Sequence, residues 1–443
     1  MSLLSYTFGL RKVPFVRDVL TVQSGSFLFM GAGFLASIAF ARFLGKDLFG
    51  TYAVVMAFAG TATAFFNIGQ GQSLYVFFAE AFGKKDRRAM SAVIANFLMV
   101  AAVNVLLLGL LAFVMPTLSD ALYGSPEIGK LARIYCLFQI SEIGNSFTLI
   151  LLQSIRRIRL KVILEQSANL SYLALAVLAL VFHAKVRGIL LIQLSVSVFV
   201  LPVSLLVLAS IARKEGLPGI REILRIPFRE SNQYLVQGLI ITVEKTIGNF
   251  FPQGLFFVAS LFLPASKMGM IRIASQMTNI TRSVVLPQAG DLSTAAFGRM
   301  KAEGVMVMRR NAAKLIKHAV AFHALVSLAA AAVFPFVVYY AYGASYLDAI
   351  PLVLILLPLS LPVSLCIANS PLLRLYRKTP YSITQAVFSW ILMLGTVWIG
   401  GVTGHPLAGF VIAYGIGMTM PLMMTAYIFL SLLRPEPTSH TAS

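Results

Sequence analysis

Four polar side chains recur on one side of an otherwise apolar segment, residues 268 to 290. Arg272, Gln276, Asn279 and Arg282 follow one another at steps of four, three and three residues. At about 100° per residue, these steps place all four within about 120° of the circumference of an α-helix. Arginine donates a fork of hydrogen bonds that matches a phosphate group, so the stripe predicts a site for an anionic ligand.

A second group of polar residues lies in the preceding apolar segment, residues 233 to 262. It contains Glu244, Lys245, Asn249 and, further on, Pro252. Lys245 and Arg282 lie at comparable predicted depths, so they can form one cationic site together with Arg272. Two alternatives stay open at this point. Glu244 can neutralise Arg282 in a structural ion pair, and Arg272, near the outer boundary, can extend to the lipid headgroups.

A third group lies in the segment from residue 131 to residue 153. Gln139, Glu142, Ser146 and Gln153 fall within about 60° of one helix face. Glu142 is the only acid that we expect well inside the first half of the chain. An ionisable group in a membrane needs a reason to be there, and coupling transport to H⁺ or Na⁺ is one such reason. A hydrogen bond to a neighbouring helix is the other.

The elements that must position these residues are membrane-spanning helices. With 58% apolar and 12% charged residues, the chain does not match soluble domains. Apolar runs of about 20 residues, each long enough to cross the hydrocarbon core, recur along the whole sequence. About twelve spans are predicted, which makes this an all-α membrane protein. They cover residues 19–41, 49–70, 90–114, 131–153, 163–182, 188–211, 233–262, 268–290, 315–340, 350–372, 380–400 and 407–433.

The spans are expected to form two six-helix halves. The predicted N-terminal lobe, linker, C-terminal lobe and disordered tail comprise residues 1–212, 213–232, 233–434 and 435–443. A faint internal repeat supports this division: Phe43-Leu44, with a glycine six residues later, recurs as Phe262-Leu263 with a glycine at the same distance. Two halves with the same orientation imply a cavity between two lobes.

The net charge of +20 does not indicate nucleic-acid binding, because the basic residues follow the predicted topology. Most lysines and arginines fall in the N-terminus, in the loops after even-numbered spans and in the C-terminus. This alternation is the positive-inside rule, and it places both termini in the cytoplasm. The basic residues also attract anionic lipids.

Prolines mark the segments where bending is expected. Pro358 and Pro362 interrupt the tenth span, and Pro252 interrupts the unusually long seventh span. Proline removes a helical hydrogen bond and kinks the helix, so these positions are predicted hinges.

One hairpin resembles a known family. The stretch from Ala41 to Ala53 contains Arg42, a Leu-Gly turn and then Phe-Gly-Thr-Tyr, and the stretch from Phe78 to Asp86 follows it. Both resemble the polysaccharide transporters, the flippases for O-antigen and exopolysaccharide. The second copy departs from the pattern at Pro264-Ala265-Ser266, where the glycine is missing. Arg42 is expected at the outer interface, as a headgroup anchor or as a gate.

The resemblance implies a member of the superfamily that includes multidrug and toxin extrusion proteins and lipid II flippases. It implies two lobes in a V around a central cavity, with alternating access. The implied substrate is an undecaprenyl diphosphate-linked oligosaccharide, flipped to the periplasmic leaflet of the inner membrane. Polysaccharide polymerase and export machinery are the implied partners. Twelve spans rather than fourteen disfavour the lipid II branch.

Other classes of function fit the sequence less well than transport of a glycan. The sequence has no ATP-binding loop and no zinc-binding pattern, so we expect neither an enzyme nor a cofactor. A membrane glycosyltransferase, ligase or polymerase needs a larger outer loop than this chain provides. A drug or cation exporter of the same superfamily is the closer alternative, and it should have acidic rather than basic cavity residues. A carrier of the major-facilitator type is not supported, because the basic motif of that family is missing between the second and third predicted spans.

Overall fold

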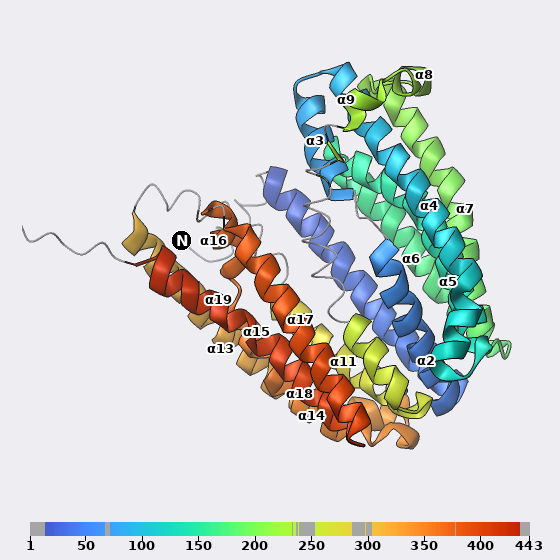
Figure 1. Ribbon diagram of the computed structural model, residues 1–443, viewed down its shortest axis with the longest axis vertical. Helices are drawn as coiled ribbons and strands as arrows, with labels where there is room; N and C mark the ends of the chain where they lie inside the picture. The colour runs from blue at the N-terminus through green and yellow to red at the C-terminus, as the bar shows by residue number, and fades with distance from the viewer. Residues whose placement is uncertain are drawn as a thin grey trace, which may run out of the picture. The chain divides into compact units, whose positions relative to one another are not determined.

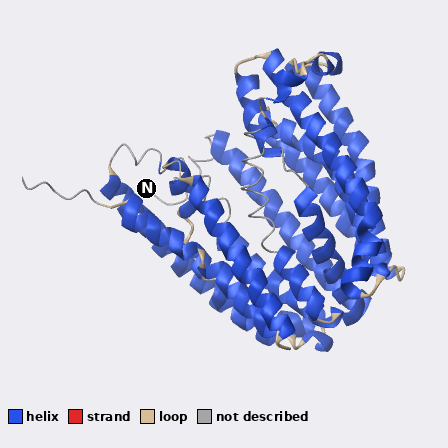
Figure 2. Cartoon of the chain, viewed as in Figure 1, coloured by secondary structure: helices blue, strands red, loops and turns tan. Residues whose placement is uncertain are grey.

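The computed structural model describes residues 14–66, 71–232, 253–285, 304–376 and 378–434, together with a few single positions (Figure 1). These residues form helices joined by turns, and Figure 2 shows no strand among them. Contacts divide the chain into two compact units, Met1–Gln253 and Gly254–Ser443. The prediction of an all-α membrane protein is confirmed.

Unit 1 is a bundle of long helices with two short helices at one end. Helix α5 packs against both α4 and α7, and α2 packs against α6. Its core includes Phe78, Phe97 and Leu152. Its helices are α2 (Pro14–Phe66), α3 (Gly71–Gly83), α4 (Arg87–Tyr123), α5 (Pro126–Ser154), α6 (Ile158–Val181), α7 (Val186–Glu215), α8 (Ile220–Leu224) and α9 (Phe228–Asn232).

Helix α2 contains the first two predicted spans in one long element. Its helical geometry is interrupted only at Gly45, which has a φ of 73° and a ψ of 174°. Glycine adopts a positive φ without the penalty that a side chain imposes, and this explains the Leu-Gly turn in the sequence. Helix α3 lies between the second and third predicted spans, and the sequence pattern did not predict it.

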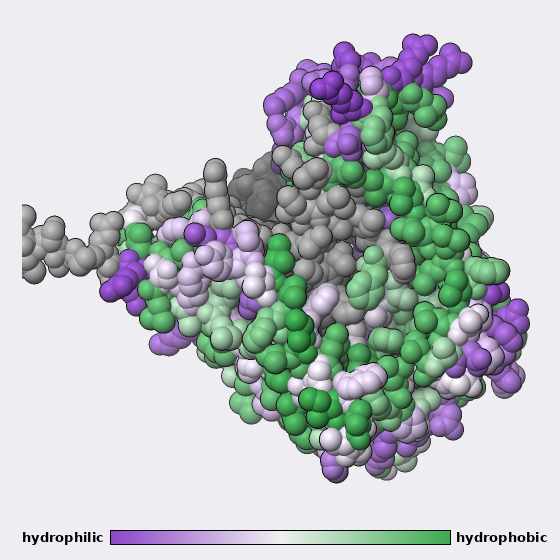
Figure 3. Space-filling model, in the orientation of Figure 1, coloured by the Kyte–Doolittle hydropathy of each residue, from purple (hydrophilic) through white to green (hydrophobic). Residues whose placement is uncertain are grey.

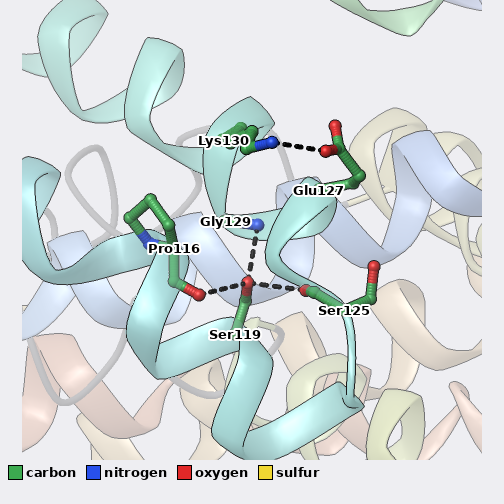
Figure 4. A network of polar contacts seen from close by, with 6 residues as sticks. All are labelled: Pro116, Ser119, Ser125, Glu127, Gly129 and Lys130. Carbon is green, nitrogen blue, oxygen red and sulfur yellow. Dashed lines mark hydrogen bonds and ion pairs between the residues drawn. The ribbon is translucent and has the colours of Figure 1, made fainter.

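The turn between α4 and α5 is held by a polar network (Figure 4). The hydroxyl of Ser119 donates a hydrogen bond to the Ser125 carbonyl and accepts one from the backbone N–H of Gly129, each at 2.8 Å. A Cβ atom on Gly129 would lie 2.3 Å from the Met115 carbonyl oxygen. The close packing of these two helices therefore requires a glycine at position 129.

The connection after α7 packs against α4. Arg87, in the first turn of α4, forms an ion pair of 2.9 Å with Glu222 on α8. Arg88 forms one of 2.5 Å with Glu230 on α9. The boundary between the two units falls after Gln253, about 20 residues beyond the predicted linker. The assignment of residues 213–232 as a linker between two six-helix lobes stays a prediction.

Unit 2 is also helical, and its α11 packs against α13 and α14. The tenth predicted span is broken, because α14 ends at Leu359 and α15 begins at Pro362. The elements are the helix Gln253–Phe262, then α11 (Ala265–Val285), α13 (Val305–Val337), α14 (Ala349–Leu359), α15 (Pro362–Leu365), α16 (Asn369–Leu375), α17 (Thr379–Val402), α18 (Pro406–Thr419) and α19 (Pro421–Tyr427).

Nine helices in the described part of the chain are long and apolar enough to span a membrane. Helix α2 counts once although it contains two predicted spans, and α11 is not among the nine because its polar stripe interrupts the apolar sequence. Large apolar side chains such as Phe113 and Phe199 are 78% and 74% exposed, as expected for residues that face lipid. In Figure 3, hydrophilic residues of unit 1 gather at its two ends, with hydrophobic residues between them.

Candidate functional site

Unit 1 contains a polar cavity of about 210 Å³ between α5, α6 and α7. Helix α5 provides Glu142, Asn145 and Ser146, and the last two lie near Glu142 because they follow it by three and four residues. The cavity also has contributions from the other two helices. Its polar lining from α6 and α7 is Glu165, Asn169, Tyr172, Gln193, Ser197 and Ser204.

Glu142 is held in this cavity by hydrogen bonds. The Ser197 hydroxyl, on α7, donates to Glu142 Oε1 at 2.5 Å, and the Asn145 amide donates to the same oxygen at 3.0 Å. Asn145 also donates to the Ser197 backbone carbonyl at 3.1 Å. The structural alternative for Glu142, a hydrogen bond to a neighbouring helix, is therefore present. The same carboxylate lines a cavity, so a coupling role stays a hypothesis. Of its predicted stripe partners, Gln139 instead binds Tyr135, through a 2.8 Å hydrogen bond.

Glu142, expected to be the only acid well inside the first half of the chain, is not the only acid that lines this cavity. Glu165 lines the same cavity. Helix α6 begins at Ile158, five residues before the predicted start, which places Glu165 two turns into the helix. Lys161 lies 3.6 Å from Glu165 on the same helix. The spacing Glu165, Asn169, Tyr172 was a signal in the sequence for a polar face on α6.

The predicted cationic stripe lies on α11, and the structure resolves its four members into different environments. Arg272, Gln276 and Arg282 are half-buried, and Asn279 is exposed. The Asn279 side-chain oxygen accepts a hydrogen bond of 3.4 Å from Arg282. Ten residues of helix correspond to about 15 Å, so Arg272 and Arg282 would contact a ligand at two separate levels.

Arg282 lies beside a buried polar cluster that sequence reasoning missed. His323 on α13 is fully buried, and its Nδ1 lies 2.5 Å from the Ser364 hydroxyl and its Nε2 lies 3.3 Å from the Ser360 hydroxyl. Arg282 interacts electrostatically with His323 and with Tyr414 on α18. The sequence signal for this cluster was the spacing of His323 and Ser327, which are one helical turn apart in an apolar run. The structure shows that both are buried.

The Arg282 guanidinium is not neutralised by an acid in the described part of the structure. Its Nε atom is buried without a hydrogen-bond partner there, and the ion pairs of the described residues do not include it. A buried donor without an acceptor is unfavourable, so this atom needs an acceptor: an anionic ligand, or Glu244, whose pairing with Arg282 the sequence left open. Four members of the second predicted group, Lys245, Glu244, Asn249 and Pro252, lie outside the described residues.

Residues 15–297 match the family described as polysaccharide biosynthesis protein. The chain belongs to this family. No curated protein matches the sequence. The resemblance seen in the first hairpin is thereby confirmed at the level of the family.

Solved structures show that this member of the polysaccharide biosynthesis family has the fold of MATE transporters. A MATE protein in complex with MaL6 has a TM-score of 0.63 and 17% identity, over 96% of this chain and 98% of that chain. An inward-facing multidrug resistance MATE transporter of the MOP superfamily has a TM-score of 0.60 and 16% identity, over 90% and 95%. A MOP superfamily transporter from Pyrococcus furiosus, described as having a binding pocket of reverse polarity, has a TM-score of 0.56 and 17% identity, over 96% and 98%.

The remaining predicted residues of this polysaccharide biosynthesis protein lie at helix breaks. Arg42 is exposed, three residues before the positive-φ turn at Gly45. Pro358 lies in the last turn of α14 and Pro362 begins α15, so the two prolines flank the break between these helices. A gating role for Arg42 and a hinge motion at the prolines stay predictions.

Proposed function

We propose that this protein is a secondary transporter that flips a lipid-linked oligosaccharide from the cytoplasmic to the periplasmic leaflet of the inner membrane. The cargo of this proposal carries a diphosphate of the undecaprenyl type. Arg282 receives the diphosphate while the prenyl chain stays in lipid. One observation carries the proposal: a buried guanidinium Nε in unit 2 lacks an acceptor among the described residues.

The chemistry of the ligand follows from the cost of burying a charge. An arginine at the centre of a membrane helix costs about 2.5–3.5 kcal/mol on insertion scales, so a buried arginine needs a compensating anion or polar cluster. His323 contacts Ser360 and Ser364. Arg282 donates to Asn279 and also interacts with Tyr414, and among the described residues it forms no ion pair with an acid. A diphosphate offers the bidentate acceptors that suit arginine. Lys245 and Arg272 extend the cationic surface in this proposal, and Gln276 lies between the two arginines on α11.

The polar cavity of unit 1 is proposed to couple transport to an ion gradient. Glu142 is the proposed coupling residue, because it lines the cavity and is held by Ser197 and Asn145. Either H⁺ or Na⁺ satisfies a carboxylate in such a cavity. A polysaccharide polymerase and export machinery are the proposed partners that receive the flipped glycan.

A drug or cation exporter is the second candidate function. It is favoured by the two carboxylates, Glu142 and Glu165, that line one cavity in unit 1. A cationic drug would bind there, and Arg282 would then have no role in binding it. The two functions therefore differ in whether Arg282 or the two carboxylates contact the cargo. Enzymatic activity is the least supported function, because the solved structures that share this fold are described as transporters.

The experiment that tests the proposal compares cargo transport by single and double variants. Full-length protein in proteoliposomes is given a fluorescent undecaprenyl diphosphate-linked glycan and, separately, a cationic dye. Arg282→Ala combined with Lys245→Ala should reduce glycan flipping at least about tenfold, because a charge-assisted hydrogen bond contributes about 1.5–3 kcal/mol. Arg282→Lys should retain part of the activity.

The matched control is Lys267→Ala, on the same helix. Lys267 lies 3.6 Å from Asp348, so it already has an acid partner. Unchanged glycan flipping by the double variant, at normal insertion, would contradict the cationic site. Transport of the dye that depends on Glu142 and Glu165 but not on Arg282 would establish the exporter instead.

A further inference from the structure

A second cavity in unit 1 lies at the end where α5 finishes and α6 begins. Its volume is about 370 Å³. The turn after α5, the first turn of α6 and the last turns of α7 line it. Its lining includes five charged residues and one apolar residue from these turns: Arg156, Arg157, Arg159, Lys214, Glu215 and Ile211. Neither of the sites described above includes any of these residues.

The lining is strongly cationic even after its one ion pair is taken into account. Arg157 donates to Glu215 Oε1 through Nε at 3.1 Å and through a second guanidinium nitrogen. This pair neutralises one cation and one anion. In the parts of the chain that the structure covers, Arg156, Arg159 and Lys214 have no carboxylate partner. Three positive charges thus face one cavity.

The backbone keeps these cations at the mouth of the cavity. Arg156 has a φ of 62°, and the Arg157 N–H donates to the Leu152 carbonyl at 2.8 Å, so the chain turns sharply between the two helices. The first turn of α6 has no capping side chain. Its N–H groups and the positive end of the helix dipole add to the potential of the side chains.

The location of the cavity at the ends of membrane helices indicates which anionic ligand can reach it. The cavity lies at the ends of three helices that are long and apolar enough to span a membrane, α5, α6 and α7. The sequence predicts this end to be cytoplasmic, because of its arginines and lysines. Leu160 and Ile211, both half-buried, provide apolar contacts beside the charges. Basic pockets between membrane helices on the cytoplasmic side bind anionic lipid headgroups.

We infer that this cavity binds the phosphate of an anionic phospholipid from the inner leaflet. The inference does not depend on the proposed transport function, because the site is in unit 1 at a membrane surface and Arg282 is in unit 2. The same chemistry would also accept a free phosphate. The experiment therefore has to separate a phosphate carried by a lipid from a phosphate in solution.

The test uses delipidated full-length protein in detergent and native mass spectrometry. Dioleoyl phosphatidylglycerol, dioleoyl phosphatidylcholine and inorganic phosphate are titrated separately. The wild type should bind one phosphatidylglycerol in preference to phosphatidylcholine. The triple variant Arg156→Gln, Arg159→Gln and Lys214→Gln should lose about fivefold in affinity for each cation removed. A control triple variant removes the same charge from exposed positions outside the cavity. It combines Arg221→Gln on α8, Arg225→Gln just after α8 and Arg229→Gln on α9.

Equal binding by the wild type and the cavity variant, or equal losses in the two triple variants, would overturn the inference. Binding of inorganic phosphate with the same dependence on the cavity cations, without binding of the lipid, would overturn the lipid assignment. If the cavity variant does not fold, the single variant Glu215→Gln tests the site instead. It frees Arg157, so it should tighten binding of phosphatidylglycerol about fivefold, and an unchanged or weaker affinity refutes the site.

Discussion

The hydroxyl of Ser197, on α7, lies 2.5 Å from the carboxylate of Glu142, on α5. Asn145 connects the same two helices, through Ser197 and through a 3.2 Å hydrogen bond that its side-chain oxygen accepts from Ser204. These contacts hold one wall of the polar cavity together. The acid proposed to sense an ion gradient is therefore also a structural link between two helices, and the two roles can be separated by substitution.

Replacing Ser197 with alanine should lower the stability of unit 1. Hydrogen bonds between membrane helices contribute about 0.6 kcal/mol on average and up to about 1.7 kcal/mol. Ser197→Ala removes the donor to Glu142 and the acceptor for Asn145 and Ser141. We expect a loss of about 1 kcal/mol in the free energy of unfolding, measured by denaturation in mixed micelles. Ser210→Ala is the control, because among the described residues the Ser210 hydroxyl bonds to a carbonyl of its own helix and to no other helix. Equal losses in both variants would contradict the prediction.

Replacing Glu142 with glutamine should uncouple transport without unfolding the protein. Glutamine keeps an oxygen that accepts from Ser197 and Asn145, but it neither releases a proton nor carries the charge that attracts Na⁺. Glycan flipping in proteoliposomes should lose its response to an imposed H⁺ or Na⁺ gradient. Glu127→Gln, at an exposed acid paired with Lys130, should leave the response intact. A gradient response that survives in Glu142→Gln would remove Glu142 from the coupling site.

Replacing Gly129 with alanine should destabilise the contact between α4 and α5. The new Cβ would lie 2.3 Å from a carbonyl oxygen and 2.5 Å from the Ser119 hydroxyl, so the two helices must separate. Overpacking of this kind costs about 1–3 kcal/mol. Gly109→Ala, at a position on α4 with no atom within 4 Å, is the matched control and should be neutral or stabilising. Thermal denaturation of both variants checks the difference in their unfolding temperatures.

Replacing His323 with alanine should weaken the packing of α13 against the broken helix α14–α15. The substitution removes contacts to Ser364 and Ser360 and leaves a void, at an expected cost of about 2 kcal/mol. His318→Ala on the same helix should change stability by less than about 0.5 kcal/mol, because His318 is exposed and its hydrogen bond goes to the Lys314 carbonyl of its own helix. Similar losses for both histidines would show that the buried cluster is not what stabilises unit 2.

The ion pair of Arg88 and Glu230 should open in acid. The hydrogen bond from Arg88 lowers the pKa of the Glu230 carboxyl below its ordinary value. A carboxyl with a lowered native pKa stabilises the folded state above its unfolded pKa of about 4.3, and this contribution is lost as the pH falls through the native pKa. Helix α9 should therefore loosen from α4 below about pH 4.

A spin label at Arg229→Cys on α9, in a background with Cys136→Ala and Cys366→Ala, reports this loosening as increased mobility. The pair is exposed, so the transition should also shift with salt. Glu230→Gln should show the mobile spectrum at every pH. A label whose mobility does not change between neutral pH and acid in the wild type would refute the prediction.

The sequence by itself determined the membrane class, most of the spans and the polar faces of single helices. The stripe from Arg272 to Arg282 and the face with Glu142 both follow from helical periodicity, and the apolar runs follow from the thickness of the bilayer. Each of these features depends on residues close together in the chain. The turn at Gly45 also belongs to this class, because its motif is local.

Only the tertiary structure decided which polar groups meet. Glu165 joins Glu142 because α6 begins earlier than its apolar run and packs against α5 and α7. His323 meets Ser360 and Ser364, 37 and 41 residues away, because the helix after α13 breaks beside it. Such pairings depend on how helices pack, and membrane helices pack through small and polar contacts that leave little trace in hydrophobic periodicity. The sequence therefore indicated where charge lies along each helix, and the packing decided which neighbours that charge has.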